Sequence, residues 1–263
     1  MNTQRFTAGE PAVEIIRITP GLWHALDDGR VTGRGEATTR PDGRVFLGVD
    51  AWHRCVFDQL ARAMLAALPE PIHTVVDETD DELVTGWRQA GLTIRRREWE
   101  YVVPTDPRVT GPALPPPGVT IVPAGAAEDG PLRELDRAVR AEVDATVGWA
   151  EMPAEVLVRP PGDTVVDPSK YAVAAEDGEY AGLVRVVQVT RLPRIGLVAV
   201  RAARRRRGIA RALLTHTLGV LHEMGIETAS AEVSEANEAA TALFESIGAR
   251  RANSTLELVR HGR

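Results

Sequence analysis

Cysteine and long apolar runs are almost absent from this sequence of 263 residues. Cys55 is the only cysteine, so no disulfide forms within the chain, and a reducing, cytoplasmic location is favoured. The longest apolar stretches, such as 195–200 and 63–68, are far shorter than the ~20 residues that span a bilayer. The polar first residues carry no apolar signal core, so we expect no membrane partner.

Excess positive charge is also lacking. The formal net charge is −6 and the isoelectric point about 5.6. Nucleic-acid binding draws much of its affinity from neutralising phosphates, so we expect no nucleic-acid partner. The hydrophobic fraction of 44% and the charged fraction of 26% are typical of a globular chain and exclude a disordered one.

A proline-rich stretch divides the sequence. Residues 106–118, DPRVTGPALPPPG, contain three consecutive prolines, which favour an extended connection. We therefore predict a lobe over residues 10–105, a linker over 106–118 and a second lobe over 119–263.

The second lobe predicts alternating strands and helices. Helical periodicity with a glycine stop predicts a helix over 208–224, and a helix beginning at Asp129 carries apolar residues at helical spacing. A further helix is predicted over 238–247. The predicted strands are 119–122, 171–175, 180–189, 194–200, 227–234 and 255–259.

The first lobe repeats much of this pattern. Asp80-x-x-Leu83-x-x-Gly86-Trp87 aligns with Asn237-x-x-Ala240-x-x-Leu243-Phe244 at an offset of 157 residues, and 99–102 aligns with 256–259 at the same offset. Upstream, Asp28-Gly29 aligns with Asp177-Gly178 at an offset of 149. We infer two copies of one α/β unit, of which the first lacks the opening helices.

A basic turn leads from the strand 194–200 into the helix that follows Gly208. The first N–H groups of a helix have no partner within it, and the helix dipole adds partial positive charge there. Gly208 and Ala210 leave the backbone accessible to a ligand. Phosphate oxygens can also accept charge-assisted hydrogen bonds from Arg205, Arg206 and Arg207. No Walker loop or GxGxxG is present, so we predict a different kind of phosphate site.

Arg205-x-x-Gly208-x-Ala210 resembles the pyrophosphate-binding signature, Gln/Arg-x-x-Gly-x-Gly/Ala, of the GNAT superfamily of N-acetyltransferases. The strand before it and the Asn237 helix after it follow in the family's order, over about residues 118 to 263. The resemblance implies an α/β (α+β) fold of two GNAT-like lobes in tandem. Each lobe would be a mixed, mostly antiparallel sheet flanked by helices.

The resemblance also implies acetyl-CoA as co-substrate. Backbone groups of Val198 and Val200 would pair with the pantetheine arm, and Asn237 would bond the pantetheine end. The pyrophosphate would lie against the backbone of Arg206, Arg207, Gly208, Ile209, Ala210 and Arg211.

The chain departs from the family at Phe244, where a tyrosine commonly protonates the departing thiolate. Phe244 cannot donate a proton, but thiolates are tolerable leaving groups because reference thiols have a pKa near 8.5. Strand alternation places Glu232 and Ser234 on one face. We expect Glu232 to act as general base through water, with Ser234 as the nearby hydroxyl. Glu142, Asp144 and Glu151 border the acceptor in this interpretation, or form a solvated charged face.

No histidine or cysteine spacing indicates a metal, so none is expected. In the first lobe the corresponding turn carries Asp50, Trp52 and Val56 and no glycine, so we expect no cofactor there. The leading hypothesis is an N-acetyltransferase of EC 2.3.1.- that acts on the primary amine of a small molecule by direct attack. A protein or peptide acceptor and a catalytically silent CoA-binding sensor stay open. The oligomeric state, monomer or homodimer, is also open.

Overall fold

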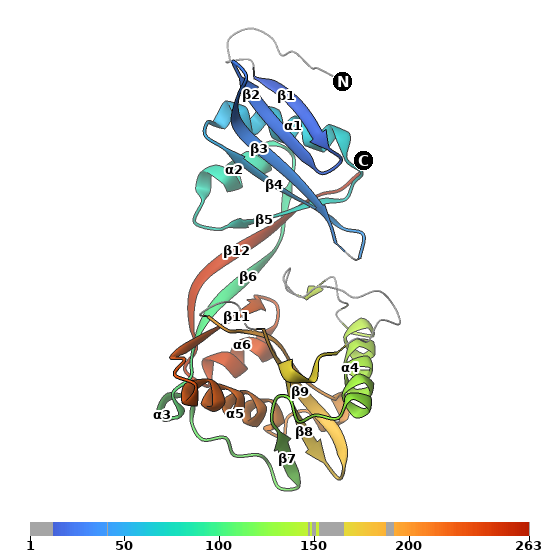
Figure 1. The fold of residues 1–263 in the computed structure, drawn as a ribbon, viewed down its shortest axis with the longest axis vertical. Coiled ribbons are helices and arrows are strands. Elements are labelled where there is room, and N and C mark those ends of the chain that lie inside the picture. The colour runs from blue at the N-terminus through green and yellow to red at the C-terminus, as the bar shows by residue number, and fades with distance from the viewer. Residues whose placement is uncertain are drawn as a thin grey trace. The chain divides into compact units, whose positions relative to one another are not determined.

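The computed structural model describes residues 13–40, 42–146, 148, 151–152, 166–187 and 192–262. The chain forms two compact units (Figure 1). The first comprises residues up to Arg97 together with those from Ser254 onward, and the second comprises Glu98–Asn253. Two strands, β6 (Thr93–Pro104) and β12 (Arg250–Arg260), contribute residues to both units.

In the first unit the sheet order is β1-β2-β3-β4-β5-β12. Its pairings are antiparallel except that of β4 with β5, which is parallel. Helices α1 and α2 pack against it around a core that includes Trp23, Leu60, Met64 and Trp87. The bounds are β1 (Glu14–Thr19), β2 (Leu22–Asp27), β3 (Arg30–Thr39), β4 (Val45–Ala51), α1 (Arg54–Ala67), β5 (Ile72–Asp77) and α2 (Asp81–Gln89).

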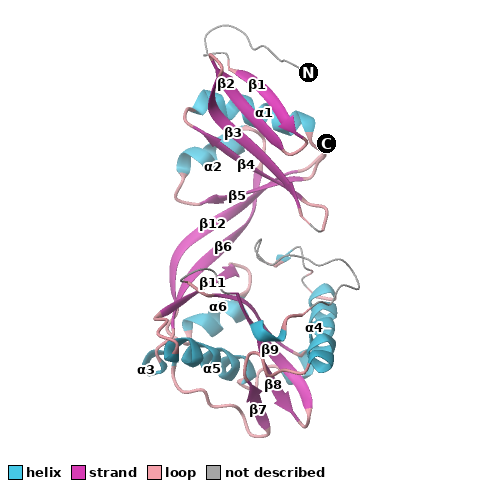
Figure 2. Cartoon of the chain, in the orientation of Figure 1, coloured by secondary structure: helices cyan, strands magenta, loops and turns pink. Residues whose placement is uncertain are grey.

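In the second unit the sheet order is β6-β11-β10-β9-β8-β7 (Figure 2). One sheet face packs against α5 and α6 in a core that includes Leu213, Ala231 and Phe244. The other face packs against α4 through Leu132, Leu135 and Leu183. The bounds are α3 (Pro107–Thr110), β7 (Val119–Val122), α4 (Asp129–Asp144), β8 (Tyr171–Glu176), β9 (Glu179–Val187), β10 (Arg194–Val200), α5 (Ile209–Glu223), β11 (Thr228–Ser234) and α6 (Glu238–Glu245).

The last strand of each repeat completes the sheet of the other unit. Residues of β6 pair with β11, whereas residues of β12 pair with β5. Tyr101 lies opposite Ala231, and Leu258 lies opposite Thr74. The 157-residue offset relates these two pairs, so the repeats have exchanged their final strands in matching register.

This division differs from the predicted lobes 10–105 and 119–263. Residues 98–105 count with the second unit, and residues 254–263 count with the first. The predicted linker 106–118 also lies in the second unit and contains α3, whose Val109 Cγ1 is 2.9 Å from where a Cβ on Gly248 would lie. A contiguous assignment fails here because the exchanged strands cross between the units.

The predicted helices and strands of the second lobe are present with small differences in length. Strands 119–122 and 194–200 have the predicted bounds, whereas β12 extends well beyond 255–259. Met224, the last residue of the helix predicted over 208–224, is 62% exposed because the helix ends before it. Both repeats turn their hairpins on Asp-Gly with positive φ, at Asp28-Gly29 and Asp177-Gly178.

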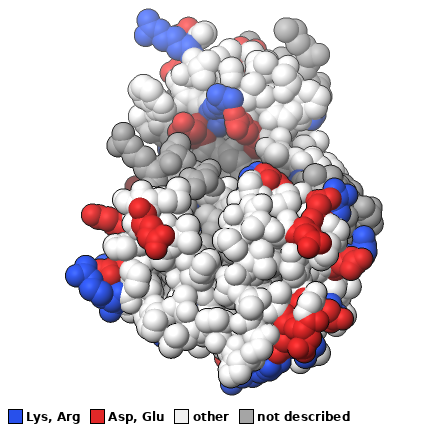
Figure 3. Space-filling view, turned by 60° about the horizontal axis from the view of Figure 1, so that its bottom comes forward, with Lys and Arg blue, Asp and Glu red and all other residues white. Residues whose placement is uncertain are grey.

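The described surface carries both signs of charge. On the face that Figure 3 shows, acidic and basic side chains surround a broad area of uncharged ones. Among the described residues, no helix is both long and apolar enough to cross a bilayer.

Candidate active site

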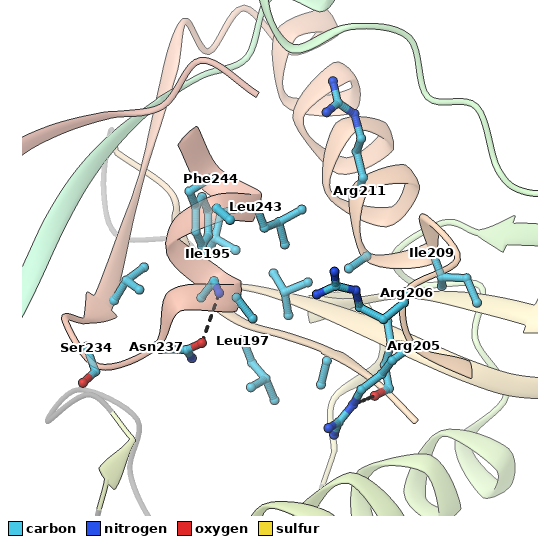
Figure 4. A pocket seen from close by; sticks show the side chains of 18 of the residues that line it. Ile195, Leu197, Arg205, Arg206, Ile209, Arg211, Ser234, Asn237, Leu243 and Phe244 are labelled. Carbon is cyan, nitrogen blue, oxygen red and sulfur yellow. Dashed lines mark hydrogen bonds between the residues drawn. The ribbon is translucent and has the colours of Figure 1, made fainter. Parts of the chain in front are cut away.

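Two neighbouring parallel strands of the second unit, β10 and β11, pair at one end and diverge toward the other. The pairing of β10 with β11 comprises only Arg194 with Ser230 and Ile195 with Ala231. A β-bulge at Gly196 follows immediately, marked by a register shift against β9. Beyond it, residues of both strands line a pocket of about 540 Å³ that is also lined by residues of α5 and α6 (Figure 4). The strands therefore diverge from an apex at Ile195 and Ala231 and leave a cleft between them.

The cleft exposes one backbone edge of β10. The N–H of Arg201 donates to Ala181 of β9 at 2.9 Å, so alternation turns the backbone groups of Val200 and Val198 away from β9. The Val200 carbonyl accepts a bond from Arg205 Nε at 3.0 Å, which confirms its direction. An extended ligand along this edge can pair with Val198 as an added strand does.

The turn after β10 provides backbone donors at the wide end of the cleft. Arg206 has φ 64° and Gly208 has φ 87°, a left-handed conformation that glycine adopts without steric cost. Gly208 is the N-cap of α5, and the first bond of the helix runs from Ala212 to the Gly208 carbonyl. The N–H groups of Ile209, Ala210 and Arg211 therefore have no partner within the helix, and these residues line the pocket. This geometry suits a phosphate group.

Two carboxylates hold most of the arginine side chains of this turn. Glu142 of α4 accepts from Arg201 Nε at 3.0 Å, from the Ala202 N–H at 2.8 Å and from Arg205 at 3.3 Å. The sequence predicts for Glu142 either a border of the acceptor site or a solvated charged face; in the structure it instead braces the basic turn 201–207.

Glu176 of β8 holds the other arginines. It pairs with Arg207 at 2.5 Å and with Arg204 at 3.1 Å. The hydrogen bond from Arg207 and the charges of both arginines hold the pKa of Glu176 below its ordinary value despite its burial. The Arg207 side chain is thus turned toward Glu176, and Arg207 is not among the residues that line the pocket. The predicted phosphate contact from the Arg207 side chain would require it to leave Glu176, so that contact stays a prediction.

Arg206 differs from its neighbours. No ion pair or hydrogen bond engages its side chain within the described part of the chain, and it lines the pocket. Figure 4 shows its side chain reaching from the turn toward the middle of the pocket. The Arg211 guanidinium, by contrast, donates to Ser246 at 3.2 Å, so Arg211 offers the pocket its backbone.

The two predicted catalytic residues lie at the pocket. Ala229, Ala231 and Val233 belong to the core, as alternation predicts, so Glu232 and Ser234 are on the other face of β11. Both line the pocket. Glu232 Oε1 accepts from Arg194 at 3.1 Å, a partner that the sequence does not indicate because 38 residues separate the two.

Phe244 lines the pocket from α6 and is 5% exposed. Its ring stacks on Tyr101 of β6, with 5.9 Å between ring centroids. The Tyr101 hydroxyl is engaged by Glu245 at 3.2 Å and by Arg251 at 3.0 Å. The Phe244 side chain therefore forms an apolar wall of the pocket. The hydroxyl of the neighbouring Tyr101 is already hydrogen-bonded to Glu245 and Arg251.

Asn237 caps α6. Its Oδ1 accepts from the Ala240 N–H at 3.0 Å, which leaves its amide nitrogen for a ligand in the pocket (Figure 4). Asp80 accepts from the Leu83 N–H at 2.9 Å in the first unit, at positions related by the 157-residue offset. Helix capping thus accounts for the Asp80 and Asn237 positions of the repeated motif, and among the described residues only the second copy lies at a pocket of this kind.

The corresponding turn of the first unit is built differently. The N-cap of α1 is His53 in an extended conformation, without the left-handed glycine of the second unit. Trp52 is 84% exposed, and Val56 lies in the core. Val56 therefore belongs to the core of the first unit, and this turn has no counterpart of the left-handed Gly208.

Residues 140–249 match the acetyltransferase (GNAT) family. The match lies within the second unit and covers the residues of the pocket, and the enzymes that this family model describes are acyltransferases. Acetyl transfer, generally from acetyl-CoA, is the chemistry of the family. No curated protein matches the chain significantly.

Solved structures resemble nearly the whole chain. A GCN5-related N-acetyltransferase from Sphaerobacter thermophilus has 19% identity and a TM-score of 0.66, over 94% of this chain and 82% of that one. A tandem GNAT protein from the clavulanic acid biosynthesis pathway has 15% identity and a TM-score of 0.64, over 96% and 84%. At these identities the likeness concerns the fold. It confirms the predicted mixed α/β class and the tandem arrangement.

The structure brings nearly all of the predicted site residues to one pocket. They are Val198, Val200, Arg205, Arg206, Gly208, Ile209, Ala210, Arg211, Glu232, Ser234 and Asn237. From the sequence we expect specificity for the acceptor to depend on loops such as residues 144–168, and most of that range lies outside the described residues. Sequence reasoning missed the bracing by Glu142 and Glu176, since neither belongs to the motif.

Proposed function

We propose that the second unit transfers the acetyl group of acetyl-CoA to the primary amine of a small molecule. The observation that carries this proposal is the parting of β10 and β11, with the Gly208 turn at its wide end. An anion cradle, an open strand edge and an apolar wall follow one another along the cleft. Acetyl-CoA presents a pyrophosphate, an amide-containing arm and an acyl group in the same order.

The residues present fit this co-substrate. The N–H groups of Ile209, Ala210 and Arg211 and the Arg206 guanidinium would hold the pyrophosphate. The edge of β10 at Val198 and the amide nitrogen of Asn237 would bond the pantetheine arm. The strand from Val200 back to Ile195 spans about 16 Å, so the reacting end would lie near the apex.

At the apex, Glu232 would accept a proton from the incoming ammonium through water, since only a neutral amine attacks a thioester. Arg194 would fix the carboxylate in place. The thiolate would leave without a proton from Phe244. A small acceptor is favoured because the pocket of about 540 Å³ must also contain much of the pantetheine arm.

Thiol release from acetyl-CoA across a panel of amines tests the proposal. Release that depends on a small amine supports it, and release only with peptides favours a protein acceptor. The alternative of a CoA-binding sensor, which Phe244 motivates, predicts calorimetric binding of acetyl-CoA with no thiol release by any amine.

A further inference from the structure

An arginine whose side chain has no partner in the described part of the chain lies beside the apex of the cleft. Arg185 is in β9, where it pairs in register with Leu197 of β10. Its NH1 atom is 3.4 Å from the position that a Cβ on Gly196 would occupy. Gly196 lines the pocket, whereas Arg185 is not itself among the lining residues. The guanidinium is therefore next to the bulge at which the reacting end of acetyl-CoA would lie.

The guanidinium of Arg185 is unusual in its surroundings. Its Nε atom is buried without a hydrogen-bond partner, and no ion pair or hydrogen bond joins its side chain to another described residue. Four other arginines around this site, Arg194, Arg201, Arg204 and Arg207, have carboxylate partners. Burying a charged donor without a partner costs free energy, so a ligand that supplies the missing acceptor has an advantage here.

Arg185 shares a face of the sheet with the carboxylate that we propose as general base. Leu183, two residues earlier on the same strand, packs in the core against α4. Arg185 therefore shares that face, opposite the core of α5 and α6. Glu232 and Arg194 are on the same face, since the neighbouring Ala231 and Ile195 belong to the other core. One sheet face thus carries both the Arg185 guanidinium, which is unpaired among the described residues, and the carboxylate proposed as general base.

We infer that the acceptor amine carries an anionic group, a carboxylate or a phosphate, which binds Arg185. This inference rests on the proposed function and narrows its substrate class. A guanidinium binds either anion through two parallel N–H···O bonds. Such an acceptor would present its amine to Glu232 and the thioester while its anionic group pairs with Arg185. Neutral amines of the same skeleton would leave the guanidinium unpaired.

Matched pairs of amines test the inference with the full chain and acetyl-CoA. L-Amino acids are compared with their α-amides, and phosphoethanolamine with ethanolamine, by kcat/KM from thiol release. We expect at least one anionic member to exceed its neutral partner by about tenfold or more, the scale of one charge-assisted hydrogen bond. The two kinds of pair distinguish a carboxylate from a phosphate.

Variants assign any preference to Arg185. Arg185→Gln should abolish it mainly through a higher KM for the anionic amine, and Arg185→Lys should restore part of it. Arg133→Gln is the control, because Arg133 lies on the exposed side of α4 and its loss changes the net charge equally. A preference that survives Arg185→Gln overturns the inference.

Failure of the inference and failure of the proposed function give different results. Turnover of neutral amines as good as that of their anionic partners overturns the inference and leaves the proposed function standing. Absence of turnover with every amine overturns the proposed function. In that case calorimetric titration of the same pairs onto the CoA-saturated protein still tests Arg185, and equal affinity for both members overturns the inference.

Discussion

Substitution of Glu142 tests how this carboxylate affects the binding of an anion at the basic turn 201–207. Glu142 either supports binding by positioning the turn or weakens binding by its negative charge. Its carboxylate binds the Ala202 N–H and two arginines close to the proposed pyrophosphate site. By charge alone, Glu142→Ala should tighten the binding of an anionic ligand. We expect the opposite, because the turn loses its brace and Arg205 its orientation. The dissociation constant of CoA should rise about tenfold, or about 1.4 kcal/mol, in calorimetric titration.

Glu134→Ala is the matched control for this prediction. Glu134 is exposed on the same helix, and its removal changes the net charge by the same amount. Tighter CoA binding by Glu142→Ala than by Glu134→Ala would show that Glu142 merely neutralises the arginines.

Glu232 can be separated from the binding of acetyl-CoA. Glu232→Gln should lower kcat by about 10²-fold or more, the scale of general-base catalysis, and leave the acetyl-CoA dissociation constant unchanged. The acidic limb of the pH–rate profile should change with it. Glu227→Gln, at an exposed position just before β11, is the control. An unchanged pH–rate profile would contradict a general-base role and would indicate that Glu232 serves only as the ion-pair partner of Arg194.

At the level of residues, the sequence predicts the features that depend only on neighbouring positions in the chain. The conformation of Gly208 and the start of α5 follow from the motif itself. The partners of the arginine run do not, because Glu142 and Arg201 are 59 residues apart and their contact depends on the fold. The sequence does not single out Arg185 for the same reason. Only the structure shows that the nearby arginines have carboxylate partners and that Arg185 has none among the described residues.

At the level of elements, helices and strands were predicted well where periodicity is strong, as in α5 and β10. The exchange of β6 and β12 could not be predicted. Their sequences align as equivalent strands, which is correct, but the sheet that a strand joins depends on pairing over long distances. Leu258 lies opposite Thr74, whereas a strand kept within its own repeat would pair near residue 231.

A buried charge cluster holds the exchanged strand β12 in the first unit. Glu257 of β12 is 1% exposed and pairs with His73 at 2.8 Å, Arg96 at 2.7 Å and Arg95 at 3.4 Å. Burial alone would raise the pKa of Glu257, but the hydrogen bond from His73 and the nearby arginines outweigh it and lower the pKa. The ionised form of Glu257 therefore stabilises the fold.

This cluster predicts a pH dependence of stability. Its contribution is complete above the pKa of an unfolded glutamate, near 4.3, and is lost as the pH falls toward the lower folded value. Glu257→Gln should lower the free energy of unfolding by about 3–5 kcal/mol at pH 7, as expected for a broken buried pair, and flatten this acid dependence. Urea unfolding between pH 3 and about 7 measures both.

Glu70→Gln is the control. Glu70 forms an ion pair at 2.8 Å with Arg260, which like Glu257 belongs to β12, and both side chains of this pair are more exposed than that of Glu257. Its loss should cost about 1 kcal/mol or less. An equal effect of the two substitutions would contradict the special role of the Glu257 cluster.

At the level of the whole molecule, the two copies share the strand order around the central helix, the Asp-Gly hairpin turn and the cap of the last helix, but only the second has α4, and the turns before their central helices differ. Asp80 and Asn237 cap their helices alike. Only the second copy places a left-handed glycine before its central helix, at the end of a described pocket. The repeat therefore explains the fold that the two copies share. The Gly208 turn explains why we expect acetyl-CoA to bind only to the second. We propose that the chain binds one acetyl-CoA although its fold offers two equivalent positions.

Calorimetric titration with acetyl-CoA tests this claim most directly. We predict a stoichiometry near one for the wild-type chain. Gly208→Val should weaken binding by well over tenfold, more than about 1.4 kcal/mol, because a branched side chain is strained at φ 87° and blocks the backbone donors. Gly219→Val, within the same helix and with open space around it, should bind normally. A stoichiometry near two, or wild-type affinity in Gly208→Val, would contradict the account.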